Sequence, residues 1–213
     1  ITGTNGKTTT TMLTYHLLHK AGLDVGMAGN VGLSFAKQVA LEDKAYYVLE
    51  ISSFQLDGMH TVALDYAVLL NISPDHLDRY DSYQAYIQSK FKINQNQQGE
   101  QKFIYCADDE DITKQLEHYS TAAQCIPFTY DGGPLAEGAW VENNQINITL
   151  NKPKTEFNMA INQLTIAGKH NTYNSMAASI IASSLLIRKE SIRESLADFK
   201  NVEHRLEYVS KVK

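Results

Sequence analysis

The chain opens with Ile1-Thr2-Gly3-Thr4-Asn5-Gly6-Lys7-Thr8, a stretch that predicts a phosphate-binding loop leading into a helix. Small residues let successive backbone N–H groups turn toward one anion, and a helix beginning near Lys7 directs the positive end of its dipole to the same point. The Lys7 ammonium would reach the outer phosphates, and the Thr8 hydroxyl would face Mg²⁺. The strict Walker A pattern requires glycine where this sequence has Ile1, so the loop is a shorter variant.

A loop of this kind normally follows a buried parallel strand, and only Ile1 and Thr2 are present to form one. The sequence shows no initiator methionine and no targeting segment, and residues 206–212 read as the start of another strand. We therefore expect residues 1–213 to be one domain excised from a longer protein.

The composition indicates an ordinary globular protein and argues against two classes of partner. Hydrophobic residues make up 43% and charged residues 20% of the chain, which suits a packed core. The net charge of -5 offers no basic stripe for nucleic acid, and no apolar run approaches the length of a membrane span. Cys106 and Cys125 are too few for a disulfide framework or a zinc site, so we expect reduced thiols in a cytoplasmic protein.

Short apolar runs alternate with helical patterns through the first part of the chain. This alternation predicts an α/β fold with a mostly parallel, P-loop-type sheet and helices on both faces. Between residues 131 and 166 the pattern changes to short alternating stretches, which predict a small antiparallel sheet appended to the first. The predicted strands cover residues 25–28, 46–51, 66–72, 103–106, 124–128, 139–141, 145–150 and 157–161. The predicted helices cover residues 7–21, 33–41, 83–93, 111–119, 172–187 and 191–199.

Glu50 lies at the end of a predicted central strand, where open parallel sheets place ligand-binding groups. A carboxylate in this position is often no more than a solvated strand end. The phosphate loop is expected at the same sheet edge and needs a carboxylate for its Mg²⁺, and the polar residues Ser52, Ser53 and Gln55 follow at once. These features favour Glu50 as a metal ligand.

The next predicted strand leads into a dense polar cluster, Asn71-Ile72-Ser73-Pro74-Asp75-His76-Leu77-Asp78-Arg79-Tyr80. Most histidines of the chain are scattered without partners, but His76 lies between Asp75 and Asp78 just beyond the strand end. As a neutral imidazole, His76 could bind a metal ion or orient a substrate.

Four other polar positions are ambiguous from the residues alone. Lys90 lies in a predicted helix, where a lysine is usually solvated. Asn30, in Gly29-Asn30-Val31-Gly32, is more simply a turn former. Asn171 could be only a helix N-cap, and Arg205 could pair with a phosphate or with its acidic neighbours.

Together these segments resemble the ATP-dependent Mur ligases of peptidoglycan synthesis, and most closely the members that add D-glutamate. The stretch Ser52-Ser53-Phe54-Gln55-Leu56 carries the finer resemblance, because members that add lysine or diaminopimelate typically have Ser-Ser-His there. The matching segments follow the order and spacing of the family along essentially the whole chain. They are residues 2–8, 29–32, 49–56, 75–80, 89–90, 170–174 and 203–207.

The resemblance implies an ATP-dependent amide ligase of peptidoglycan precursor synthesis. ATP would phosphorylate the terminal carboxylate of UDP-N-acetylmuramoyl-L-alanine, and the amine of D-glutamate would attack the acyl phosphate to give an amide, ADP and phosphate. In the family, an N-terminal domain binds the UDP moiety and a C-terminal domain brings the amino acid. Neither domain fits within residues 1–213, so we expect the excised domain alone to have little or no ligation activity. The full-length protein is expected to be a cytoplasmic monomer.

The resemblance also implies roles for individual residues. Two Mg²⁺ ions would be held by Thr8, Glu50, His76 and a carbamylated Lys90, in which the cation has become a carboxylate-like group. The expected catalytic residues are Lys7, Glu50, His76 and Lys90. The substrate would meet Asn30, Ser52, Gln55 and His76. The nucleotide would meet Gly3, Thr4, Asn5, Gly6, Lys7, Thr8, Thr9, Asn171, Asn174 and Arg205.

Two alternatives stay open. The chain could be a nucleotide-binding module that signals without forming a bond; Glu50, His76 and Lys90 argue against this, because such a switch needs only the loop and one Mg²⁺. A related ligase with another amino acid or a folate substrate is the second alternative, because the domain that selects the amino acid is expected to lie outside this chain.

Overall fold

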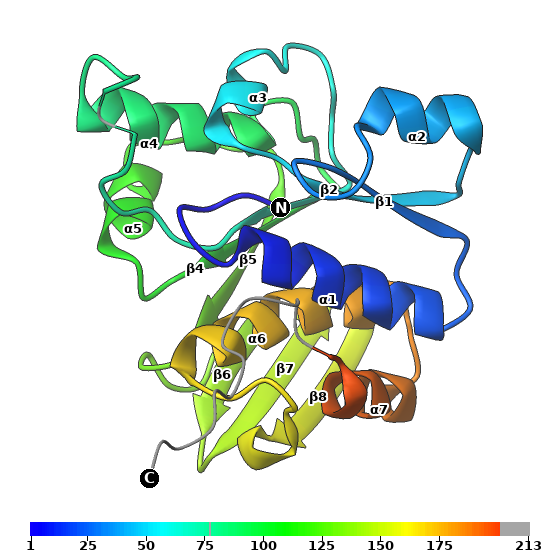
Figure 1. The fold of residues 1–213 in the computed structure, drawn as a ribbon. Helices are drawn as coiled ribbons and strands as arrows, with labels where there is room; N and C mark the ends of the chain where they lie inside the picture. Colours follow the sequence, from blue (N-terminus) through cyan, green and yellow to red (C-terminus); the bar gives the residue numbers. More distant parts are fainter. Residues whose placement is uncertain (77, 201–213) are drawn as a thin grey trace, which may run out of the picture.

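The structure is a computed structural model, and it describes residues 1–76 and 78–200. It has the predicted α/β architecture, with helices packed around strands that run through the middle of the molecule (Figure 1). The strand predicted at residues 206–212 and the predicted site residue Arg205 lie outside the described part of the chain.

The main sheet begins as a parallel sheet and ends as an antiparallel one. In spatial order the strands are β3 (Tyr66–Leu69), β4 (Lys102–Cys106), β5 (Gln124–Thr129), β6 (Gly138–Glu142), β7 (Gln145–Asn151) and β8 (Lys154–Ala160). β5 pairs in parallel with β6 through Phe128 and Ala139, and the pairs β6–β7 and β7–β8 are antiparallel. The predicted antiparallel strands are confirmed, and they continue the edge of the parallel sheet rather than standing apart from it.

Ile1 and Thr2 lie between this sheet and a separate parallel pair, β1 (Val25–Gly29) and β2 (Tyr46–Glu50). The backbone nitrogen of Ile1 donates to the carbonyl of Leu49 on one side at 2.8 Å. On the other side, the N–H of Thr2 donates to the carbonyl of Val68 at 2.8 Å. The two residues therefore occupy the place of a strand between β2 and β3, as predicted for the approach to a phosphate loop.

Helices cover both faces of the parallel strands (Figure 1). The helices are α1 (Lys7–Lys20), α2 (Phe35–Leu41), α3 (Ser53–Asp57), α4 (Tyr83–Phe91), α5 (Glu110–Leu116), α6 (Lys169–Ser184) and α7 (Lys189–Asp198), with short 3₁₀ turns at Lys92–Asn94 and Ile161–Gln163. On one side α1 packs against α6 and α7, and on the other α3 packs against α4 and α4 against α5. The helix α3 was not predicted, because its five residues are too few to show a helical period.

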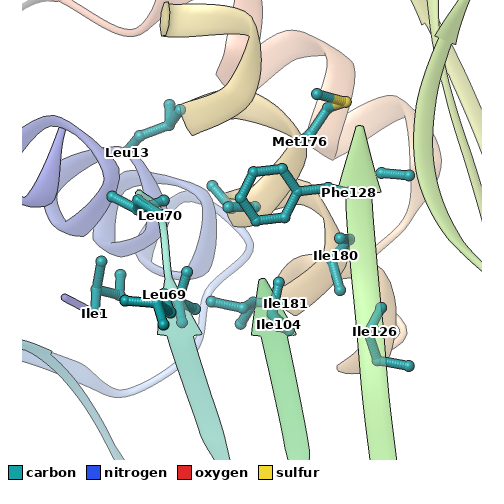
Figure 2. Packing of buried hydrophobic residues seen from close by; sticks show 14 of the residues in the cluster. Ile1, Leu13, Leu69, Leu70, Ile104, Ile126, Phe128, Met176, Ile180 and Ile181 are labelled. Atoms are coloured by element: carbon teal, nitrogen blue, oxygen red, sulfur yellow. The ribbon is translucent and has the colours of Figure 1, made fainter. Parts of the chain in front are cut away.

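The main core lies between the parallel strands and the helices α1 and α6 (Figure 2). Leu13 of α1 and Met176 and Ile180 of α6 are fully buried there, facing apolar side chains of the strands such as Ile104 and Phe128. Burying one such side chain contributes about 1.5–3 kcal/mol. This packing fixes the first turn of α1 against the ends of the strands, which is where the polar residues of the site lie.

Cys106 and Cys125 are free thiols, as expected. Burial raises the pKa of the Cys106 thiol to about 12, so that it stays protonated at neutral pH. Among residues 1–76 and 78–200, none of the helices combines the length and the apolarity that a bilayer crossing requires.

Candidate functional site

The loop between Thr2 and α1 has the geometry of an anion-binding loop. Gly6 caps α1 with a φ of 82°, a left-handed conformation that favours glycine. A Cβ atom on Gly6 would lie 2.6 Å from Oδ1 of Asn174, so a larger residue would displace the Asn174 side chain. Because α1 has 14 residues, the positive end of a long helix dipole is directed at the loop.

Lys7 curls back over this loop. Its Nζ donates to the carbonyl of Gly3 at 3.0 Å and to the carbonyl of Thr4 at 2.9 Å. The ammonium group thus lies at the loop that would hold the phosphates.

A cavity of about 350 Å³ joins the loop to two other elements. Thr8 lines it from the first turn of α1, Asn30 from the turn after β1, and Glu50 from the end of β2. The carboxyl ends of parallel strands meet at one edge of a sheet, which is why residues so far apart in sequence converge here. The structure therefore brings together Lys7, Thr8, Asn30 and Glu50.

Glu50 is only 2% exposed, although it carries a carboxylate. Its Oε1 accepts a hydrogen bond from Nδ2 of Asn30 at 3.1 Å, while its buried Oε2 has no hydrogen-bond partner among the described residues. Burying a charged oxygen without a partner is costly, and a bound cation would remove that cost. Carboxylate and hydroxyl oxygens are also what Mg²⁺ prefers, so Glu50 and Thr8 fit one magnesium ion.

Asn30 contacts Glu50 with both its backbone and its side chain. Its N–H donates to the Glu50 carbonyl at 2.9 Å, in addition to the side-chain bond to Oε1. The preceding residue, Gly29, passes so close to β2 that a Cβ on it would lie 2.2 Å from the Glu50 carbonyl oxygen. Asn30 therefore orients the Glu50 carboxylate. A residue that only formed a turn would not be expected to make these contacts.

Lys90 is buried, although its place in a helix suggested a solvated side chain. It is 2% exposed, its Nζ donates to the carbonyl of Gly3 at 2.8 Å, and the same atom lies 4.7 Å from the centre of the Tyr86 ring. Burial, assisted by the nearby charge of Lys7, lowers the pKa of Lys90 to about 7, and Asp75 opposes this shift. A large fraction of the Lys90 amine is consequently neutral at neutral pH.

Replacing Lys90 with methionine is expected to stabilise the fold near neutral pH. The pKa of Lys90 falls from 10.5 to about 7 on folding, so folding releases a proton between these pH values. The burial cost is full below about pH 7 and fades as the pH rises toward 10.5. The Lys90→Met variant should gain about 1–3 kcal/mol in the free energy of unfolding at pH 6, and less at pH 9.5. Urea titrations in CO₂-free buffer would measure this; a gain that does not change with pH would contradict it.

His76 lies beside the cavity rather than in its lining. Its side chain is 47% exposed, its Nε2 is 3.6 Å from Oδ2 of Asp75, and its ring centre is 5.2 Å from that of Phe54. Tyr86 provides the link to the loop, because its ring is 6.5 Å from His76 and its hydroxyl lies 3.1 Å from Oγ1 of Thr4. Across the residues that the structure describes, no three His, Cys, Asp or Glu side chains gather as a metal cluster.

Ser52 and Gln55 bond to each other and cap α3. Oε1 of Gln55 accepts hydrogen bonds from the backbone N–H of Ser52 at 2.8 Å and from its hydroxyl at 3.0 Å, while the Ser52 hydroxyl accepts from the N–H of Gln55. This capping box is the sequence signal that could have identified α3. Gln55 nevertheless remains exposed, so its side-chain amide is accessible to a ligand.

Asn171 and Asn174 lie in the first two turns of α6. The N-cap of α6 is Gly168, so Asn171 is not the cap. Asn174 accepts a hydrogen bond from the Thr10 hydroxyl at 3.0 Å and donates to Oδ1 of Asn171 at 3.2 Å, which ties α6 to α1 directly beneath the loop. Thr9, another predicted nucleotide contact, is buried on α1.

Thr4 directs its hydroxyl toward the protein. The hydroxyl accepts from the N–H of Ser73 at 2.9 Å and lies within hydrogen-bond distance of the Ser73 carbonyl and of Tyr86. The side chain of Thr4 therefore makes its hydrogen bonds within the protein. The roles of Ser73 and Tyr86 were not predicted, because their contacts to the loop join residues 69 and 82 positions apart.

The chain is similar to proteins of a known family along most of its length. The family model for the Mur ligase middle domain matches residues 1–182. A UDP-N-acetylmuramoylalanine–D-glutamate ligase of Christiangramia forsetii is 50% identical over all 213 residues, and one of Bacteroides fragilis is 50% identical over an alignment of 216 positions. In both cases the match covers 100% of this chain and 47% of the relative, so the chain spans about half the length of these curated relatives.

Solved structures support the same fold. A UDP-N-acetylmuramoyl-L-alanyl-D-glutamate–2,6-diaminopimelate ligase superposes with a TM-score of 0.75 at 19% identity, covering 99% of this chain and 47% of that one. MurF from Acinetobacter baumannii gives a TM-score of 0.72 at 20% identity, covering 98% and 47%. Because the middle-domain model matches most of the chain and relatives at 50% identity align with all of it, this chain belongs to the Mur ligase family.

Proposed function

We propose that this chain is the middle domain of an ATP-dependent ligase that joins D-glutamate to UDP-N-acetylmuramoyl-L-alanine. The observation that carries the proposal is the shared cavity, in which a phosphate loop and Lys7 meet a buried carboxylate with a free oxygen, Glu50. The relatives that are 50% identical over the whole chain, and that are named as D-glutamate ligases, support this choice of substrates.

In the proposed reaction the γ-phosphoryl group of ATP passes to the alanine carboxylate. The amine of D-glutamate then displaces phosphate from the acyl phosphate, which forms the amide. The first step brings two anions together, so it needs positive charge at the loop, and the Lys7 ammonium supplies part of it. Thr8 and Glu50 would hold Mg²⁺, which neutralises charge that develops on the phosphates.

Carbamylation of Lys90 is part of the proposal. A neutral amine adds to CO₂ and releases a proton, giving a carbamate, and the lowered pKa of Lys90 keeps much of its amine neutral at pH 7. The ammonium form would repel metal ions, whereas the carbamate would attract them. We infer that carbamylated Lys90 and His76 support a second Mg²⁺ ion.

The remaining predicted contacts belong to the same proposal. The UDP-linked substrate would meet Asn30, Ser52, Gln55 and His76, and the nucleotide would meet the loop Gly3–Thr8 with Thr9, Asn171, Asn174 and Arg205. The UDP-binding and amino-acid-binding domains would lie in the rest of a cytoplasmic, monomeric protein. Because relatives are about twice as long, the chain by itself should catalyse little or no ligation.

Transfer of labelled phosphate tests the reaction. The full-length protein, given UDP-N-acetylmuramoyl-L-alanine with ¹⁸O in its terminal carboxylate, ATP and D-glutamate, should release phosphate that carries one ¹⁸O atom. This label arises because the carboxylate oxygen leaves with the phosphoryl group. Nucleotide binding without labelled phosphate would favour a signalling module, and label released only with another amino acid would favour a related ligase.

A further inference from the structure

Asn71 holds the phosphate loop from the neighbouring strand. It follows β3, and its side-chain Oδ1 accepts from the N–H of Asn5 at 2.8 Å while its Nδ2 donates to the Asn5 carbonyl at 3.0 Å. The carbonyl of Asn71 accepts in addition from the N–H of Thr4 at 2.9 Å. One half-buried asparagine therefore satisfies three backbone polar groups of Thr4 and Asn5 in the loop.

The backbone that carries Asn71 is itself anchored. The N–H of Ile72 donates to Oδ2 of Asp109 at 2.8 Å, and Oδ1 of the same carboxylate accepts from the N–H of Ile112 at 3.0 Å, which caps α5. Ser73 adds the bonds to the Thr4 hydroxyl described above. The amide of Asn71 is thus presented from a rigid support, as a positioning group requires.

We propose that Asn71 is a positioning residue that keeps the loop in its anion-binding shape by pairing with both backbone groups of Asn5. Asn5 is exposed and lies next to Gly6, whose backbone is intrinsically free, so the loop would sample other conformations without this pairing. A loop that is ordered before the nucleotide arrives binds it more tightly, because the ordering cost is already met. The inference rests on the proposed nucleotide site.

Two substitutions in the full-length protein separate positioning from general stability. Asn71→Ala removes both side-chain bonds to Asn5. Asn71→Asp keeps the size of the side chain and the acceptor for the Asn5 N–H, but it adds a negative charge beside the anion site. Asn96 is the matched control, because its half-buried amide also ties down backbone, donating to the carbonyls of His60 at 3.0 Å and Val62 at 3.1 Å, away from the loop.

Two measurements are needed: the Kd for Mg²⁺–ADP by calorimetry, and amide hydrogen exchange of residues 3–6 without nucleotide. Asn71→Ala should raise the Kd about tenfold and speed exchange in the loop. Asn71→Asp should raise the Kd about tenfold further, and this additional loss should shrink at high salt because charge repulsion causes it. Asn96→Ala and Asn96→Asp should lower the Tm yet change the Kd by less than about twofold.

The two proposals fail in different ways. Loop exchange in the Asn71 variants that equals exchange in the Asn96 variants would overturn the positioning role, whatever the affinity for nucleotide. A Kd for the Asn71 variants that matches the wild type would overturn it as well. A wild-type protein that binds no Mg²⁺–ADP, but whose loop loosens on substitution of Asn71, would instead overturn the proposed nucleotide site.

Discussion

Replacing Lys7 with alanine is expected to lower the ligation rate of the full-length protein by about 10³-fold. The ammonium of Lys7 lies 3.0 Å from the Gly3 carbonyl, at the N-terminal end of α1, where the phosphates would bind. In a transfer between two anions, a positive charge at that point stabilises the transition state more than the bound ground state. The rate of ADP release at saturating substrates measures the effect.

The control for this variant is Lys20→Ala, at the opposite end of α1. Lys20 bonds to Asp198 on the surface, so its loss removes a lysine from the same helix without touching the loop. Activity of the Lys20 variant should stay within about twofold of wild type, because an exposed ion pair contributes little to the stability of the fold. If Lys7→Ala turned over as fast as Lys20→Ala, the assignment of the phosphate loop would be wrong.

Lys90→Ala should lower the rate by about 10²-fold, and small carboxylates should restore part of it. The removed side chain is only 2% exposed, so truncation leaves a buried space next to the Gly3 carbonyl. Acetate or formate in that space would replace the carboxylate-like end of a carbamylated lysine. Steady-state rates with increasing formate, at constant ionic strength, measure the rescue.

Lys92 is the matched control for the rescue. It lies two residues further on, bonds to Asp57 and has a side chain that is 41% exposed, so Lys92→Ala should lose little activity and gain none from formate. Full activity of Lys90→Ala without formate would show that the lysine serves no catalytic purpose. A loss of activity that no carboxylate restores would remove the support for a carbamate while leaving Lys90 in the site.

The pattern of the sequence was sufficient to predict most of the helices and strands, and the meeting of Glu50 with the opening loop. Alternating apolar runs and helical stretches led to a parallel sheet, and Glu50 at a strand end was expected at the same sheet edge as the opening loop. These predictions succeeded because they depend on local periodicity and on a general property of parallel sheets. The pairing of β6 with β5 was not predictable in the same way, since it joins segments across an irregular connection.

The contacts among the site residues were decided by tertiary packing. Lys90 reads from its helix as a solvated lysine, yet the packing of α4 over the loop buries it and lowers its pKa to about 7. In the sequence Asn71 is one of several polar residues in a cluster, and only the fold shows that it bonds to Asn5, 66 positions away. The sequence alone determined most of the helices and strands and the sheet edge where the parallel strands end, because backbone geometry and burial patterns are local. Only the tertiary structure decided which side chains lose water and which partners they find, because desolvation and hydrogen bonding depend on neighbours that are distant along the chain.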